Sequence, residues 1–432
     1  MKESETMQEE RRRKRYIRKQ IMTTNGYLRK VRELSGMPES MEPFLSVFEN
    51  LFVKGGDVPH LPEQKTVGTY CVMVPQELIM AAGAHPVKLC SGSYTAFSIG
   101  DDLTPRDACP LVKAVEGSLD IGVMQLYNNC SLMAIPVTCD CKKKLAGYLG
   151  QKKRVCTLQI PANREDEDLE QYVSQLYGFA VALEEVTGRH ITYDNLAAAM
   201  EQSGYAQFEL SRFLETKKQT PYLVRGTHAL LMMNASAYLS AADWAKQMHL
   251  VNRELSERKK TGQYVSKKEL PRSLLTGSPL IFPNIKIPLL VEEAGGYIAA
   301  DETCLGERGL SDPVVPVDES FDGLMRSLAM RATRPCSCPT FADNSRRVFR
   351  LRQMIRDYRI EGVIYHVLRG CLVYDFEYQK IEEALREENI PVIRVESDYS
   401  EEDVEQLRIR MEAFVELIKL KKPAEKHKEN LV

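Results

Sequence analysis

The stretch VGTYCVMVPQELIMAAGAHPVKLCSGS (residues 67–93) predicts a strand, a helix and a second strand in direct succession. Its TVGTYC segment is short and β-rich, PQELIMAAGA has helix-forming composition, and HPVKLC returns to strand character. Strands that alternate with helices are typical of a parallel sheet with right-handed crossovers. Each predicted strand ends on a cysteine, Cys71 or Cys90, so this stretch indicates both a fold and a chemistry.

The same alternation continues to residue 161 and returns at residue 271. In the first part the pattern further predicts helices over 109–117 and 142–151 and strands over 118–128, 134–140 and 155–161. In the second part it predicts strands over 273–280, 295–304, 362–371 and 391–400 and helices over 285–294, 346–359, 377–388 and 401–419. The two parts look like a weak internal duplication. Because ligands of open parallel sheets lie beyond the carboxyl ends of the strands, we expect two sheets that face one shared cleft.

Helical patterns occupy the rest of the chain. A charged helix is predicted over about residues 5–35, a second helical piece follows, and residues 163–262 carry helical periodicity around the single tryptophan, Trp244. The expected fold class is therefore α/β, with two parallel-sheet domains, a helical N-terminal segment and a helical insertion. We divide the chain into a helical N-terminal segment (1–60), a first α/β domain (61–162), a helical insertion or linker (163–270), a second α/β domain (271–420) and a frayed tail (421–432).

Charge and hydropathy exclude several classes of function. The formal net charge of −2 gives no reason to expect nucleic acid binding. No stretch approaches ~18 uncharged apolar residues, so no membrane span is expected. The N-terminus has basic residues but lacks the apolar core of a secretory signal, which predicts a cytoplasmic protein. The basic run from Arg11 to Arg15 is interpreted as a solvated helix face, with contact to an anionic partner as the alternative.

Eleven cysteines are the strongest chemical signal in the chain. A reducing cytoplasm keeps thiols free, so such an excess favours a metal site over a disulfide framework. Cys109 opens a predicted helix, whose N–H groups and dipole stabilise a thiolate, while Cys139 and Cys371 each end a predicted strand. Thiolates gathered from distant strand ends suit an iron–sulfur cluster better than a local zinc knuckle. The alternative for each residue is a buried free cysteine.

A second group of cysteines lies at similar places: Cys71, Cys90, Cys304, Cys336 and Cys338. Cys336 and Cys338 form a turn-like CxC in RPCSCPT, and at least one of the two is expected to face a site. A zinc site at this pair is disfavoured because no CxxC or histidine pair completes it. The remaining cysteines are predicted to be structural or exposed: Cys130, Cys141 and Cys156.

Other polar residues support or limit this hypothesis. Glu77 is either a carboxylate at a helix start or the catalytic acid/base of the site. Asp140 is predicted to cap the helix that follows it. His366 is interpreted as a satisfied core or surface histidine rather than a ligand, while Asp375 and Glu377 are candidates for shaping the site around Cys371. The sequence contains neither a GxxxxGK(S/T) P-loop nor a GxGxxG dinucleotide fingerprint.

On these residues the chain resembles the 2-hydroxyacyl-CoA dehydratase/benzoyl-CoA reductase family, D-component type, and most of all its double-cubane cluster branch. The matching stretches span about residues 64–415 and comprise VGTYCVMVPQELIMAAGAHPVKLCSGS, TPRDACPLVKAVEG, VTCDCKKKLAGYL, GGYIAADETCLGERG, RPCSCP, RGCLVYDFE and IPVIRVESDYSEEDVEQLRIRMEAF. Two segments depart from the family pattern. They are YNNCSLMAIP and the segment around Ser278, where some relatives carry cysteine, so the substrate is open.

The resemblance implies two flavodoxin-like domains around an iron–sulfur centre, a homodimer, and a separate dimeric ATPase that delivers low-potential electrons. It implies a 4Fe–4S cubane on Cys109, Cys139 and Cys371. In the double-cubane branch the second cysteine group supports an 8Fe–9S cluster. The candidate cofactor-binding residues are thus Cys71, Cys90, Cys109, Cys139, Cys304, Cys336, Cys338 and Cys371, and all of them except Cys336 are candidate metal ligands.

Three functions remain open on the sequence. The first is an iron–sulfur reductase of small molecules that depends on an ATP-hydrolysing activator and works at a double-cubane cluster. The second is a single-cubane (R)-2-hydroxyacyl-CoA dehydratase subunit, paired with a homologous chain and acting by radical dehydration. The third is a non-catalytic iron–sulfur electron carrier. The extra cysteines favour the first.

Overall fold

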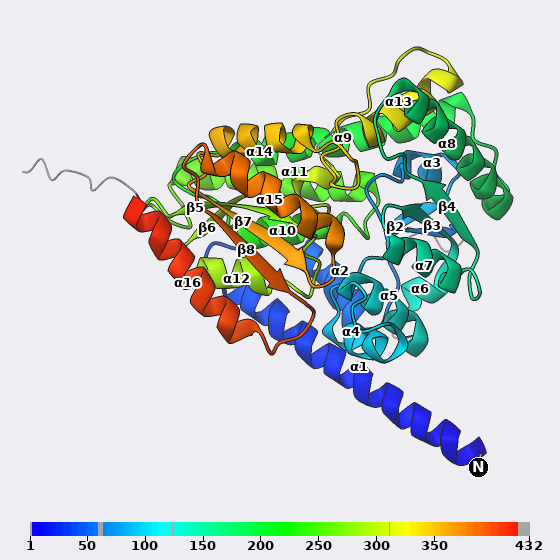
Figure 1. The fold of residues 1–432 in the computed structure, drawn as a ribbon, viewed down its shortest axis with the longest axis horizontal. Coiled ribbons are helices and arrows are strands. Elements are labelled where there is room, and N and C mark those ends of the chain that lie inside the picture. Colours follow the sequence, from blue (N-terminus) through cyan, green and yellow to red (C-terminus); the bar gives the residue numbers. More distant parts are fainter. Residues whose placement is uncertain (1, 59–63, 123, 311, 422–432) are drawn as a thin grey trace, which may run out of the picture.

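A computed structural model describes residues 2–58, 64–122, 124–310 and 312–421. Its strands form two four-stranded sheets, both parallel throughout (Figure 1). The first sheet has the order β2-β1-β3-β4 and consists of β1 (Thr66–Thr69), β2 (His85–Lys88), β3 (Cys130–Val137) and β4 (Val155–Gln159). The second has the order β6-β5-β7-β8 and consists of β5 (Arg272–Gly277), β6 (Tyr297–Glu302), β7 (Gly362–Leu368) and β8 (Val392–Ser397).

The two sheets repeat one topology. In each, the second strand in sequence lies outside the first, and the third and fourth follow on the other side. Every residue of β5, β6 and β7 is buried, as expected for parallel strands covered by helices on both faces. The structure thus has the α/β class and the paired sheets expected from the sequence, consistent with two flavodoxin-like domains.

Helices connect and cover the strands of both sheets (Figure 1). Around the first sheet lie α3 (Gln76–Ala81), α4 (Tyr94–Leu103), α5 (Pro110–Ile121), α6 (Gln125–Asn129) and α7 (Asp140–Leu149). The part of the chain that contains β5–β8 also forms α12 (Lys286–Glu293), α13 (Phe321–Thr333), α14 (Ser345–Asp357), α15 (Leu372–Arg386) and α16 (Val404–Lys421). Neither α4 nor α13 was predicted from the pattern.

The strand predicted over 118–128 is wrong. Helix α5 continues to Ile121 and ends at Gly122, whose φ of 59° suits the left-handed residue at a helix end. Helix α6 follows, and the strand begins only at Cys130. Periodicity does not decide between helix and strand here, because the short apolar run IGVMQLY is compatible with both. The neighbouring CSLMAIPV has the stronger β pattern.

The expected helical segments are present. The N-terminal segment contains α1 (Lys2–Glu33), a short 3₁₀ turn and α2 (Glu42–Phe52), and the first half of α1 extends away from the body (Figure 1). The insertion contains α8 (Asp166–Thr187), α9 (Tyr193–Lys217), α10 (Gly226–Ala235) and α11 (Ala241–Thr261). None of the described helices is long and apolar enough to cross a membrane. The predicted tail lies outside the described residues from residue 422 onward.

Helix α13 joins the two halves of the molecule. It follows β6 in sequence, yet its Leu324, Met325 and Leu328 lie in one buried cluster with Val67 of β1 and Leu78 of α3. The halves also meet at Gly92, where an added Cβ would stand 1.8 Å from the carbonyl oxygen of Ile281. Close backbone approach of this kind requires glycine. These contacts hold the carboxyl ends of both sheets around one space.

Candidate metal centre

Cysteines follow the same strands in both sheets at nearly the same distance. Four of them, Cys71, Cys90, Cys139 and Cys304, stand two residues after the ends of β1, β2, β3 and β6. Cys371 stands three residues after the end of β7. Because the carboxyl ends of parallel strands share one edge of the sheet, this spacing delivers thiols from both sheets to the cleft between them.

The thiols meet in a cavity of ≈ 360 Å³ with a mostly apolar wall. Leu111, Val112 and Ile281 contribute to that wall, and Ser278 and Lys142 are among its polar members. Both α/β halves line it. Eight cysteines lie on its surface: Cys71, Cys90, Cys109, Cys139, Cys141, Cys304, Cys338 and Cys371. Seven of these are predicted ligands, and the eighth is Cys141, for which the sequence predicts a structural or exposed role.

Cys109, Cys139 and Cys371 are the N-cap residues of α5, α7 and α15. The first backbone N–H groups of a helix have no partner within it and favour a negative charge at this position. The sequence pointed to a helix start for Cys109 alone. At Cys139 it misassigned the cap, since Asp140 is the first residue inside α7 rather than its N-cap.

The thiols of this first group act on one another. A hydrogen bond from the Cys109 thiol lowers the pKa of Cys371 to about 7, with further help from the backbone N–H of Tyr374 and from Ser278. The same bond and burial raise the pKa of Cys109. Burial also raises the pKa of Cys139. A lowered pKa at Cys371 favours the thiolate, the form in which cysteine binds soft metals.

The second group forms its own electrostatic neighbourhood. Burial raises the pKa of Cys338 well above its usual value, and the thiols of Cys336, Cys304 and Cys71 add to the effect. Burial likewise raises the pKa of Cys90 to about 12, with Cys71 and Cys304 among the further causes. The thiols of the second group therefore act on one another, as those of the first group do.

Two cations that the sequence analysis did not single out as site residues stand against these thiols. Arg308 donates to the sulfur of Cys304 at 3.5 Å and to the hydroxyl of Tyr374 at 3.0 Å, while Glu302 holds its other nitrogens at 2.8 and 3.0 Å. Lys142 lines the cavity and donates from Nζ to the carbonyl oxygen of Tyr70 at 3.2 Å. The lysine run after Cys141 and the stretch GERG, which contains Arg308, are the signals in the sequence from which these residues could have been found.

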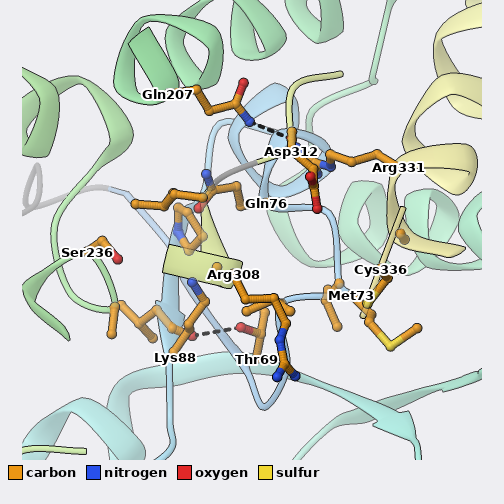
Figure 2. A pocket seen from close by; sticks show the side chains of 18 residues that line it. Thr69, Met73, Gln76, Lys88, Gln207, Ser236, Arg308, Asp312, Arg331 and Cys336 are labelled. Carbon is orange, nitrogen blue, oxygen red and sulfur yellow. Dashed lines mark hydrogen bonds between the residues drawn. The ribbon is translucent and has the colours of Figure 1, made fainter. Parts of the chain in front are cut away.

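Cys336 lies apart from the cavity. It is buried and borders a second, smaller pocket of ≈ 50 Å³, which shares Val72 and Lys88 with the cavity wall. Figure 2 shows Lys88, Asp312 and Arg331 around that pocket, with Cys336 beside Met73. The structure thus places every candidate metal ligand on the surface of the cavity. Cys336, the one remaining cofactor-binding candidate, borders the adjoining pocket. Cys130 and Cys156 belong to β3 and β4 and do not line the cavity.

Glu77 does not line the cavity either. Its side chain is fully buried at the start of α3, and both carboxylate oxygens accept from Arg331 of α13, at 2.6 and 2.7 Å. Burial raises the pKa of Glu77, but Arg331 outweighs that effect and the pKa lies below its usual value. The carboxylate therefore joins the two halves of the molecule, while its role as an acid/base stays a prediction.

The residues after Cys371 and the strand histidine have structural partners. Glu377 is buried, accepts from Tyr365 at 2.8 Å and pairs with Arg347 at 3.1 Å, whereas Asp375 pairs with Arg394 near the surface. His366 is fully buried, which confirms its interpretation as a satisfied core histidine: Nδ1 donates to the carbonyl oxygen of Ser278 and Nε2 accepts from Ser397, both at 2.9 Å. Burial lowers its pKa to about 4.

The cavity offers the thiol donors that iron–sulfur clusters take. Among the described residues, no group of three or more His, Cys, Asp or Glu side chains is arranged to hold one metal ion. A cluster distributes its ligands over several irons, so its thiolates do not need to converge on one point. Free thiols around one mostly apolar cavity, with cations beside them, meet that requirement.

Comparisons with known proteins agree with this chemistry. A family model described as 2-hydroxyglutaryl-CoA dehydratase, D-component, matches residues 71–418. The chain is 29% identical over 356 residues to the dehydratase-like protein YjiM of Escherichia coli (strain K12), covering 82% of this chain and 91% of the relative. It is 21% identical to the beta subunit of (R)-2-hydroxyglutaryl-CoA dehydratase of Acidaminococcus fermentans, covering 82% and 92%. It is 22% identical to one of the subunits of benzoyl-CoA reductase of Thauera aromatica, covering 83% and 92%.

Proposed function

We propose, from the premise that this chain belongs to the 2-hydroxyglutaryl-CoA dehydratase D-component family, that it is an iron–sulfur reductase that acts on a small substrate at a double-cubane cluster. The main observation in support of the proposal is the number of thiols that line one cavity. Cys109, Cys139 and Cys371 suffice for one cubane, and the same cavity holds further thiols beyond them. These further candidates are Cys71, Cys90, Cys304 and Cys338.

Each part of the cavity has a role in this proposal. The first group binds one cubane at three helix starts, where N–H groups favour thiolates. The second group binds the other cubane, and Arg308 orients Cys304 within it. The apolar wall around Leu111 and Ile281 excludes water from the site. When bound, such a cluster supplies single electrons at a low potential.

The proposal includes an external source of energy. Iron–sulfur potentials extend down to about −700 mV, and each ~59 mV of one-electron driving force corresponds to about 1.4 kcal/mol. Because the sequence contains no P-loop, the energy would come from a separate ATP-hydrolysing activator. A homodimer and a reducing, cytoplasmic setting complete the proposal, and the eleven free cysteines support that setting.

A second candidate is a single-cubane (R)-2-hydroxyacyl-CoA dehydratase subunit. The observation that favours it is the separate clustering of Cys109, Cys139 and Cys371, which would hold one cubane without the second group. The names of the matched dehydratase subunits agree with such a role. Among the described residues, no contact specifically supports a non-catalytic electron carrier.

The two candidate functions differ in the substrate and in whether that substrate consumes electrons from the reduced cluster. The anaerobic protein, reduced with titanium(III) citrate, would be mixed with small reducible molecules or with an (R)-2-hydroxyacyl-CoA. The reductase proposal predicts net, stoichiometric reoxidation by a small molecule. Catalytic loss of water from the hydroxyacyl-CoA, to give the 2-enoyl-CoA without net consumption of electrons, would replace it with the dehydratase.

A further inference from the structure

One lysine of a run of three enters the cysteine cavity. The residues Lys142, Lys143 and Lys144 follow Cys141 in the first turns of α7. Lys142 lines the cavity, whereas Lys143 and Lys144 are exposed. Successive residues of a helix point about 100° apart, so one turn can direct only part of such a run toward a partner. Helix geometry therefore selects Lys142.

The ammonium of Lys142 is held in place from outside the helix. Its Nζ donates to the carbonyl oxygen of Tyr70 at 3.2 Å, in the turn between β1 and Cys71. Lys142 thus reaches from the helix that begins at Cys139 to the loop that carries Cys71. These two cysteines belong to different groups, so the ammonium lies where the groups adjoin.

Two lysines line the cavity, Lys142 and Lys88. Lys88 ends β2, two residues before Cys90. Lys142 instead starts from the helix that begins at Cys139 and reaches the loop that carries Cys71. Of the two lysines, Lys142 is thus the one whose contacts connect both cysteine groups.

We propose that Lys142 is a positioning residue whose fixed positive charge is shared by both cysteine groups and raises the reduction potential of the cluster they hold. The inference rests on the proposed function, since it concerns the same site. A fixed cation stabilises the more negative, reduced state of a cluster, and net charge is one of the factors that set iron–sulfur potentials. Its charge also offsets the repulsion between neighbouring thiolates.

Four variants separate charge from packing. Lys142→Gln retains a donor for Tyr70 and removes the charge, whereas Lys142→Met removes both. Lys142→Arg keeps the charge, and Lys143→Met removes an exposed charge from the same turn. Each protein is purified anaerobically and assayed for iron. The reduced fraction is then measured by EPR at the solution potential that half-reduces the wild-type cluster.

We expect the ratio of reduced to oxidised cluster to fall about tenfold in both Lys142→Gln and Lys142→Met, equivalent to about 59 mV for one electron. Lys142→Arg and Lys143→Met should match the wild type. A wild-type ratio in Lys142→Gln, with full iron, would overturn the inference, because the hydrogen bond alone would then explain Lys142. If Lys142→Gln and Lys142→Met lose iron while Lys142→Arg retains it, the cluster needs the positive charge already when it assembles, which supports the inference. Loss of iron from all three Lys142 variants would overturn it.

Failure of the proposed function would have a different signature. If the wild-type protein binds no iron after anaerobic reconstitution, the cluster proposal fails before any variant is compared. If the wild type binds iron and Lys142→Gln titrates identically, only the inference on Lys142 fails.

Discussion

Gly370 and Asp107 lie on different halves of the molecule, and their backbones touch: a Cβ on Gly370 would stand 2.5 Å from the carbonyl oxygen of Asp107. Gly370 has a φ of +74°, a conformation that disfavours any other residue. It directly precedes Cys371, and Asp107 stands two residues before Cys109. The contact between two thiols of the cavity therefore depends on a glycine.

Replacing Gly370 by alanine should move these two loops apart. We expect Gly370→Ala to lower the free energy of unfolding by about 1–2 kcal/mol from the left-handed conformation alone, with a further loss from the displaced backbone. Iron bound per chain should also fall. The matched control is Gly147→Ala in α7, where an added Cβ meets nothing within 4 Å. That variant should be neutral or more stable by about 0.5–1 kcal/mol, and an equal loss of iron in both variants would refute the account.

The ligand assignment makes a direct prediction for single cysteines. Cys139→Ala should abolish the low-potential EPR signal while the helices of the insertion stay folded, as judged by circular dichroism. Cys156→Ala should leave the signal unchanged, because Cys156 lies within β4 and away from the cavity. Full iron content in Cys139→Ala would show that this residue is not a ligand.

Glu77 can be tested for structure against catalysis. Removing one partner of a buried ion pair costs about 3–5 kcal/mol because the other charge is left unpaired. Glu77→Gln should therefore destabilise the protein in urea unfolding, and the double variant Glu77→Gln/Arg331→Met should recover part of that loss. Unchanged stability together with lost turnover would instead support the acid/base role predicted from the sequence.

Stability should fall on mild acidification. The pKa of His366 is lowered to about 4 by burial, so the folded protein binds this proton more weakly than the unfolded chain, whose histidine titrates near its usual 6.5. The stabilising contribution is complete above that usual value and is lost as the pH falls from about 6.5 toward 4. His366→Asn should flatten this part of the profile of unfolding free energy against pH. Identical profiles for the wild type and His366→Asn would contradict the prediction.

The alternating pattern predicted the fold well because buried parallel strands read as apolar runs, as in GVIYHVL of β7. It failed where a short apolar run had two compatible conformations, in residues 118–128. It also missed α13, because the partners of that helix lie in the other half of the molecule: Leu324 and Leu328 pack against residues of β1 and α3. Local periodicity carries no information on such partners.

The candidate site was predictable to the extent that its residues end strands. Strand ends share one edge, so Cys71, Cys139 and Cys304 could be placed together without a structure. The orientation of side chains along a helix or loop could not be obtained in this way. Lys142 enters the cavity while Lys143 and Lys144 do not, and Glu77 pairs with Arg331 instead of facing the cysteines. Both outcomes depend on packing between distant segments.

Iron and acid-labile sulfide per chain, measured after strictly anaerobic purification and combined with EPR of the dithionite-reduced protein, test the central claim most directly. The account predicts about eight irons per chain, two cubanes' worth. About four irons would shift it to the single-cubane dehydratase. No iron after anaerobic reconstitution would contradict it and leave the cavity cysteines as buried thiols.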